Sequence, residues 1–224
     1  MASRAERADR RTDALSKERI VETAIEILDA GGEGALTFRA LAARLATGSG
    51  AIYWHVANKD DLLTAATNDV IARVVTETAG DAHPREAIRA VALGVFDAID
   101  AHPWVGAQLS RAPWLVAMPQ IFEGMGGRLQ ALGVPERAQF DATLALVSYT
   151  LGVAGQNAAN ARLHAPGTDR TAVLGAAAAQ WAQLDPARYP FVHRVAAQLP
   201  EHDDREQFLA GIDLILAGIQ APRH

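Results

Sequence analysis

The chain has 224 residues, of which 50% are hydrophobic, and its 21 basic and 26 acidic side chains give a formal net charge of -5 at pH 7. This length and apolar content suit one long or two short globular domains with a sizeable core, and the acidic balance excludes a protein that coats nucleic acid through overall charge. The absence of cysteine excludes disulfides, thiol redox sensing and thiolate metal sites.

Residues 1–14 form a charged segment without an apolar run, in which arginines alternate with acidic residues: Arg4, Glu6, Arg7, Asp9, Arg10, Arg11 and Asp13. Two interpretations stay open: a solvated, disordered tail, or an arginine arm that reaches the minor groove or the phosphates of DNA. Because the segment has no apolar h-region, we expect neither a signal peptide nor a membrane anchor, and therefore a cytoplasmic protein with no membrane partner.

Three short helices are predicted after this segment. The first runs from Ser16, as N-cap, to Ala30, where two glycines are expected to end it. Thr37 is expected to cap the second, which places Leu41 inside and Arg39 outside. The third follows a glycine-containing turn and extends roughly over 49–55.

Positive charge is concentrated in this part of the chain. From residue 34 to residue 59 the sequence has three basic side chains, Arg39, Arg44 and Lys59, and no acidic one. Two short helices around a tight turn, with a local basic surface, are typical of a helix-turn-helix that reads DNA. The alternative is an all-α protein that never touches DNA, in which residues 53–55 only fill the core.

The segment from Ile20 to Leu63 resembles the DNA-binding domain of the TetR family of bacterial regulators. The matching residues are Ala24, Leu28, Gly32, Leu36, Thr37, Arg39, Leu41, Ala42, Leu45, Ile52, Tyr53, His55, Val56, Lys59 and Leu62. The run over 53–59 is similar to the tetracycline repressor subgroup, and so is the last predicted helix, through Phe208, Gly211, Ile212, Asp213, Leu214, Ile215, Gly218 and Ile219.

The resemblance implies an all-α fold in which a three-helix helix-turn-helix domain precedes a helical-bundle domain for ligand binding and dimerisation. We therefore divide the chain into an arm over 1–14, a DNA-binding domain over 15–63 and a ligand-binding and dimerisation domain over 64–224. A helix from Lys59 to about Ala79 is expected to connect the two domains. Two DNA-binding domains in a homodimer, with recognition helices about 34 Å apart, would read a palindromic operator on double-stranded DNA.

The resemblance also assigns roles at the DNA. Base edges are expected to meet Arg39 and residues 49–51, and phosphates to meet four further side chains. The expected DNA-binding set is Thr37, Tyr53, His55 and Lys59 at phosphates, together with Arg39, Gly48, Ser49, Gly50, Ala51 and Trp54. The residues at 48–50 differ from the larger or more rigid ones of the tetracycline repressor, so we expect a different operator.

The middle of the chain places large side chains beside prolines that interrupt helices, which is typical of a pocket for an apolar or aromatic small molecule. Ordinary core packing is the alternative. Polar groups on the following long helix would orient a neutral ligand. The candidate ligand-binding residues are His102, Trp104, Trp114, Phe122, Met125, Gln156, Asn157 and Asn160.

A magnesium chelate is not expected as the ligand. The tetracycline repressor holds one through a histidine near the position of Leu109 or Ser110 and an acidic residue near Gln156, and neither type stands there in this chain. Because hard cations prefer carboxylate oxygen, which these positions lack, we expect no bound metal. We expect no other cofactor either.

Two apolar helices are expected to pair with their twofold mates in a four-helix dimer interface. Residues 142–161 carry no formal charge, but polar side chains on one side argue against a transmembrane helix. Its predicted interface stripe is Leu144, Val147, Leu151, Ala154 and Ala158, and the last helix, over 203–219, contributes Phe208, Ile212, Ile215 and Ile219.

The sequence therefore predicts a non-enzymatic, sequence-specific transcriptional regulator, a ligand-responsive repressor released from its operator by a small apolar or aromatic molecule. One alternative is a metal-dependent hydrolase that uses His193, His202, Asp203 and Asp204, although a helix cap explains the aspartates more simply. The other is a helical interaction module that does not bind DNA.

Overall fold

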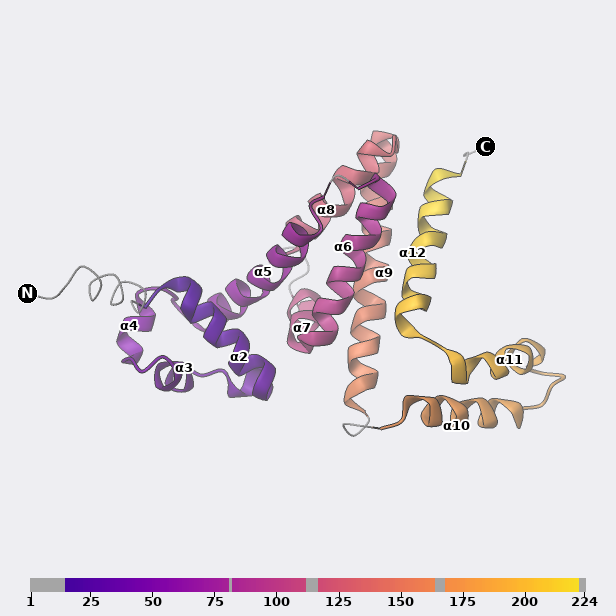
Figure 1. Cartoon of the computed structure of the whole chain (residues 1–224), viewed down its shortest axis with the longest axis horizontal. Coiled ribbons are helices and arrows are strands. Elements are labelled where there is room, and N and C mark those ends of the chain that lie inside the picture. Colours follow the sequence, from indigo (N-terminus) through magenta and orange to yellow (C-terminus); the bar gives the residue numbers. More distant parts are fainter. Residues whose placement is uncertain (1–14, 81, 112–116, 164–167, 222–224) are drawn as a thin grey trace, which may run out of the picture.

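The computed structural model of the chain describes residues 15–80, 82–111, 117–163 and 168–221, and every regular element in these ranges is a helix. The arm over 1–14 and Trp114 lie outside the described residues. Figure 1 shows the order of the elements. They are α2 (Lys17–Ala35), α3 (Phe38–Arg44), α4 (Ser49–Tyr53), α5 (Lys59–Glu77), α6 (Pro84–Ala101), α7 (Pro103–Arg111), α8 (Met118–Ala131), α9 (Glu136–Arg162), α10 (Arg170–Ala182), α11 (Pro190–Val195), the 3-10 helix η1 (Ala196–Glu201) and α12 (Asp204–Gln220).

Helices α2 to α4 form a small domain at one end of the molecule, closed by the first turns of α5 (Figure 1). Its core consists of aliphatic side chains that are at most 1% exposed: Ile20, Ala24, Leu28, Leu36, Leu41, Ile52, Leu62 and Leu63. Both predicted caps are confirmed, since Ser16 Oγ accepts from the Arg19 amide at 3.2 Å and Thr37 Oγ1 accepts from the Ala40 amide at 3.1 Å. These caps fix where α2 and α3 begin.

The first helix is longer than predicted. The backbone leaves the helical region at Gly32, which has φ 68° and ψ -172°, but a further helical turn follows and α2 ends at Ala35. Glycine tolerates this positive φ without steric cost. Gly32 thus interrupts the helix where the two glycines were predicted to end it, and a short turn over 33–35 extends α2 beyond the kink.

The larger domain, the body, packs α6 in its centre against α8, α9 and α12, as Figure 1 shows. The face of α6 that points inward is aliphatic and fully buried at Ile88, Val91, Val95 and Ile99. Where α6, α9 and α12 meet, the ring of Phe208 stacks on Phe96 at 4.7 Å and on Tyr149 at 5.7 Å between centroids. This aromatic cluster attaches the last helix to the bundle.

The apolar stripe predicted to face a partner helix on α9 is covered in large part by the same chain, while Leu144 and Leu151 are half-buried. Val147, Ala154 and Ala158 are 3%, 1% and 5% exposed because α6, α7, α8 and α12 pack around α9. On α12, Phe208 and Ile212 are buried in the same way. The exposed residues in the middle of the two helices are mostly small ones, and they include Ala145, Ser148, Gly152, Gln156 and Ala159 on α9, and Ala210, Leu214, Ala217 and Gly218 on α12.

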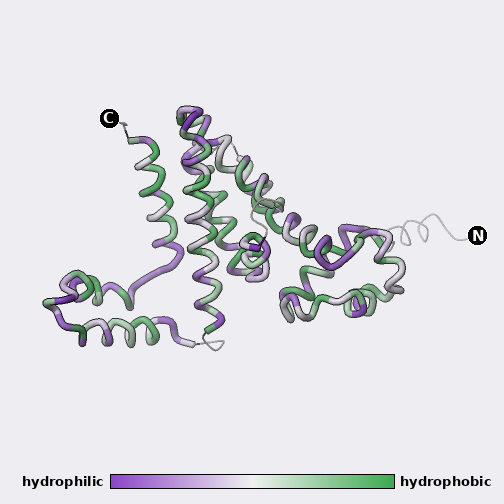
Figure 2. Tube along the Cα trace, turned by 180° about the vertical axis from the view of Figure 1, so that it is seen from behind, coloured by the Kyte–Doolittle hydropathy of each residue, from purple (hydrophilic) through white to green (hydrophobic). Residues whose placement is uncertain are grey.

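Helices α10, α11 and η1 pack on one another and project from the body between α9 and α12 (Figure 1). No residue of α10 or α11 is buried within the chain. Hydrophobic positions occur along both α10 and α12, as Figure 2 shows. No helix in the described ranges is long and apolar enough to cross a membrane.

Candidate nucleic-acid interface and domain junction

Helix α4 presents the surface expected to read DNA. It is short, it begins after Gly48, and its only buried residue is Ile52. The opposite side is exposed at Ser49 and Gly50, and at the end of the helix Trp54 is 90% exposed. A five-residue helix anchored by one aliphatic side chain thus leaves most of its surface free for an outside partner.

An aromatic stack fixes the end of this helix. The rings of Tyr53 and Phe38 lie 4.3 Å apart between centroids with an interplanar angle of 4°. Tyr53 remains 54% exposed, while Phe38 packs against the core of the domain. Residues 53–55 therefore do not fill the core, because Tyr53, Trp54 and His55 are all exposed.

The three basic side chains of the segment have different surroundings. Arg39 is exposed on α3. Arg44 lies 3.5 Å from the Glu26 carboxylate, with both side chains more than half exposed. Lys59 Nζ donates to the Glu33 carbonyl oxygen at 2.6 Å and thereby caps the last turn of α2. Lys59 thus links α5 to α2 in addition to the phosphate contact predicted for it.

Two of the candidate ligand-binding residues lie at the junction between the domains. His102 Nδ1 lies 2.7 Å from Asp29 Oδ1, and Trp104 Nε1 donates to the same oxygen at 2.8 Å. Trp104 is only 6% exposed. Both side chains therefore contact α2 of the small N-terminal domain.

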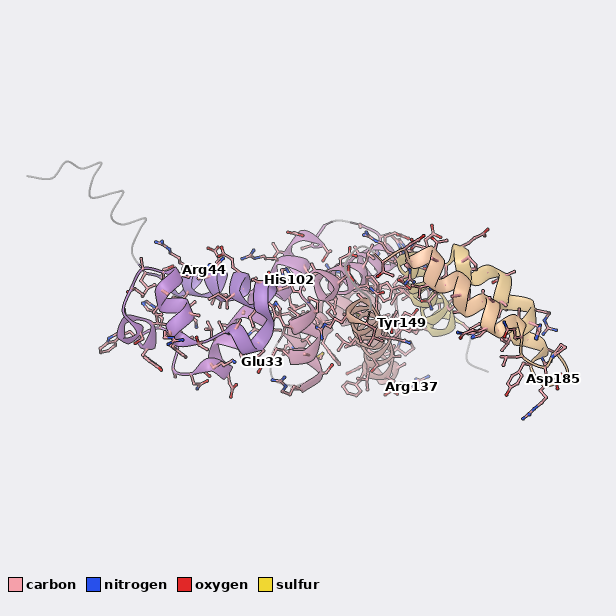
Figure 3. All side chains as sticks on the ribbon, turned by 90° about the horizontal axis from the view of Figure 1, so that it is seen from below. Glu33, Arg44, His102, Arg137, Tyr149 and Asp185 are labelled. Atoms are coloured by element: carbon pink, nitrogen blue, oxygen red, sulfur yellow. The ribbon has the colours of Figure 1, made fainter. Side chains whose placement is uncertain are left out.

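A second carboxylate of α2 crosses the same junction. Glu33 accepts from Arg111 through both carboxylate oxygens, at 3.0 and 3.2 Å, and from Gln108 at 3.2 Å. The hydrogen bonds from Arg111 hold the pKa of Glu33 below its ordinary value, so this carboxylate is charged at neutral pH. Figure 3 shows Glu33 and His102 where the small N-terminal domain meets the body.

The remaining ligand candidates do not converge on one place. Met125 is fully buried on α8, and the Phe122 ring lies 6.2 Å from that of Phe140. On α9 the Asn157 amide donates to Asp100 at 3.0 Å, whereas Gln156 and Asn160 are exposed.

A cavity of about 360 Å³ lies between α6, α7 and α9. Its walls are small or aliphatic, including Ile99, Gly106, Ala107, Leu151 and Gly155, with Ser110 and Arg162 as polar groups. None of the predicted ligand-binding residues that the structure describes lines it. The sequence signal was the recurrence of glycine and alanine on α7 and α9, which leaves space between helices where larger side chains would fill it.

The residues considered for a hydrolase have structural contacts. Asp203 Oδ1 accepts from the Glu206 amide at 2.8 Å, which confirms the helix-cap interpretation for this residue. Asp204 pairs with Arg170 at 2.5 Å and lies 3.2 Å from His202. Within the described residues, no three histidine, aspartate or glutamate side chains are arranged to hold a metal ion.

Comparison with known proteins finds matches over both domains. The profile described as bacterial regulatory proteins, tetR family, matches residues 20–66, and the one described as tetracyclin repressor-like, C-terminal domain, matches residues 79–223. An HTH-type transcriptional regulator of Saccharopolyspora erythraea is 34% identical over 110 residues, and the match spans 49% of this chain and 47% of that protein. The HTH-type transcriptional repressor DrrR1 of Streptomyces coeruleorubidus is 29% identical over 92% of this chain and 77% of that protein.

Solved structures agree over most of the chain. The transcriptional regulator SCO7222, a TetR from Streptomyces coelicolor, is 53% identical with a TM-score of 0.85, and the match covers 92% of this chain and 98% of that one. ActR of the same organism, solved in complex with actinorhodin, shares the fold at 24% identity and a TM-score of 0.75, over 92% and 95% of the two chains. The chain therefore belongs to the TetR family of bacterial transcriptional regulators.

Proposed function

We propose that this chain is a dimeric, ligand-responsive repressor of the cytoplasm that binds a palindromic operator through α4. The observation that carries the proposal is the exposed surface of α4, where Trp54 is 90% and Tyr53 54% exposed although both are large aromatic residues. Such residues are costly to leave in water unless a partner covers them. The basic, acid-free surroundings over 34–59 favour DNA as that partner.

In this proposal Arg39 and residues 49–51 approach base edges, and Gly48 and Gly50 allow the close approach that a side chain would prevent. Thr37, Tyr53, His55 and Lys59 hold phosphates, and Trp54 lies against the DNA backbone beside them. The hydroxyl of Thr37 caps α3 as an acceptor, so its hydrogen remains available to a phosphate.

The dimer forms through the outer faces of α9 and α12. These faces carry small residues, which allow close helix packing, and Leu214, which is 76% exposed. A second copy would bury this leucine and the hydrophobic positions that protrude on α10. The twofold axis then places the two α4 helices about one turn of DNA apart.

The effector occupies the cavity between α6, α7 and α9. Its lining favours a small apolar or aromatic molecule, and its volume of about 360 Å³ lies in the range of ligand pockets. Gly106, Ala107 and Ser110 on α7 line the cavity, while Trp104, Gln108 and Arg111 of the same helix contact α2. A ligand that favours another position of α7 would therefore shift the DNA-binding domain. To move the protein from nearly all bound to nearly all free of the operator, the ligand must favour the non-binding conformation over the binding one by about 5.5 kcal/mol.

The test is fluorescence anisotropy of the full chain with the DNA that flanks its own gene, across salt concentrations. We expect saturable binding with a steep negative salt slope and weak competition by random DNA. Arg39→Ala should weaken binding by about 1 to 3 kcal/mol. Arg137→Ala is the matched control, because Arg137 is an exposed arginine on α9, far from α4 (Figure 3).

Selection from random duplexes completes the test if the flanking DNA does not bind. Failure to enrich any sequence, together with full solubility and a folded protein, would refute DNA binding and leave the interaction module as the function. Equal loss in Arg39→Ala and Arg137→Ala would show that overall charge, and not the α4 surface, attracts the DNA.

A further inference from the structure

We propose that Asp29 and Glu33 are positioning residues that lock the DNA-binding domain against α7 in one orientation and thereby set the half-site spacing that the dimer accepts. This inference rests on the proposed function, because it concerns how the two domains are held when the protein binds an operator. We call the contacts of Asp29 and Glu33 with the body the α2–α7 latch.

The latch joins α2 to one face of α7. Asp29 and Glu33 lie on either side of the kink at Gly32, and both carboxylates reach donors of α7. Their partners Trp104, Gln108 and Arg111 are spaced by four and three residues on α7, which places them on one face of that helix. His102, directly before α7, adds a second contact to Asp29 at 2.7 Å.

The position of the carboxylates on α2 favours this role over a local one. Both belong to the C-terminal half of α2, whose last turn contains no basic residue. The helix dipole disfavours negative charge there, so within the DNA-binding domain alone these residues would be slightly destabilising. Their favourable contacts lie across the junction, in the donors of α7.

Three contacts of the latch restrict the orientation of α2 relative to α7. Trp104 is 6% exposed and its indole N–H is held by Asp29, so its ring cannot turn freely. Arg111 engages both oxygens of Glu33, and a bidentate pair restricts direction as well as distance. Lys59 holds the carbonyl of the same Glu33 at 2.6 Å, so α2, α5 and α7 meet at one residue.

Small changes of angle matter because α5 acts as a lever between the domains. Its 19 residues correspond to a length of roughly 28 Å at 1.5 Å per residue. A tilt of about 7° would move the end of such a lever by roughly 3.4 Å, which is the rise of one base pair along a strand. Without the latch, therefore, the two α4 helices of a dimer would sample spacings that differ by a base pair or more.

The experiment compares the wild-type chain with the double variant Asp29→Asn and Glu33→Gln, which keeps side-chain size but removes both charges. The DNA is the palindrome that wild-type protein selects, with its central spacer unchanged, one base pair shorter or one base pair longer. For the wild type we expect about a tenfold or greater rise in Kd for either altered spacer. The spacing ratio is the Kd for an altered spacer divided by the Kd for the unchanged one. For the double variant this spacing ratio should fall by at least about threefold, whereas its affinity for the unchanged site should fall by less.

Glu26→Gln is the matched control, because Glu26 is also a carboxylate of α2 but pairs with Arg44 inside the DNA-binding domain. It should keep the spacing ratio of the wild type. Thermal unfolding of all variants checks the fold, and the single variant Glu33→Gln, measured in the same way, replaces the double variant if the latter does not fold.

A folded variant that loses the latch but keeps the wild-type spacing ratio would overturn the inference. A reduced spacing ratio in Glu26→Gln would also overturn the inference, because it would show that loss of any negative charge on α2 has this effect. Absence of operator binding by the wild type is a different result, because it would refute the proposed function itself.

Discussion

The junction of α6, α9 and α12 offers a prediction whose magnitude follows from the structure. Phe208 is fully buried, and its ring stacks on both Phe96 and Tyr149. Replacing it with alanine removes the transfer free energy of the ring and leaves a cavity lined by those two rings. We therefore expect Phe208→Ala to destabilise the protein by about 3 to 5 kcal/mol.

Leu214 on the same helix is the matched comparison. It is 76% exposed in the protomer, so Leu214→Ala should change protomer stability by no more than about 0.5 kcal/mol. If α12 forms the dimer interface, however, the same change should weaken the dimer. The two substitutions thus separate packing within the chain from packing between two copies.

The assay is urea unfolding followed by circular dichroism at two protein concentrations, with sedimentation velocity for the oligomeric state. Dimer association adds to the apparent stability in a concentration-dependent way, so both concentrations are needed. Phe208→Ala should lower the unfolding midpoint at each concentration, and Leu214→Ala only where the wild type is dimeric. A loss below about 1 kcal/mol for Phe208→Ala would refute the argument that this ring anchors α12.

Three further predictions concern single contacts. The hydrogen bond from the Arg89 guanidinium lowers the pKa of Asp213 from its ordinary value of 3.8. The Arg89–Asp213 pair therefore stabilises the fold above pH 3.8, and this stabilisation is lost as the pH falls through the lower pKa of the folded state. Asp213→Asn should make the free energy of unfolding depend less on pH in this acidic range, and an unchanged pH profile would contradict the argument. A methyl group at Gly211 would overlap the Tyr149 ring, so Gly211→Ala should lower the melting temperature despite its better helix propensity, and an increase would show that the ring can move aside. Ser16→Ala removes the cap of α2 and should cost about 1 kcal/mol in chemical denaturation, whereas a neutral result would mean that solvent replaces the cap.

Local signals were sufficient for the DNA-binding domain. Its caps at Ser16 and Thr37, its buried Leu41 and Ile52, and its exposed Arg39 follow from residue type and spacing within a few residues. Capping and helical periodicity act over one or two turns, so a sequence displays them directly. The all-α fold class and the family resemblance were likewise readable from the chain alone.

The tertiary structure decided which side of α9 is buried. A stripe such as Val147, Ala154 and Ala158 indicates an apolar face but does not say whether the same chain or a second copy covers it. At Gly32 the sequence indicated the interruption of the helix but not the further turn over 33–35, because a positive φ permits a chain to resume its helix as readily as to leave it. The burial of the α9 stripe depends on neighbours that are distant in sequence.

The same limit applies to the domain junction. Asp29 and Trp104 are separated by 75 residues, and no local pattern relates a carboxylate near the end of one helix to an indole N–H at the start of another. Chain periodicity determines which face of each helix a residue occupies, whereas the packing of α2 on α7 brings those faces together. The sequence alone therefore determined the all-α fold class, the caps of α2 and α3 and the exposed position of Arg39. The three-dimensional arrangement decided how the small N-terminal domain is joined to the body, because only long-range packing makes distant polar groups partners.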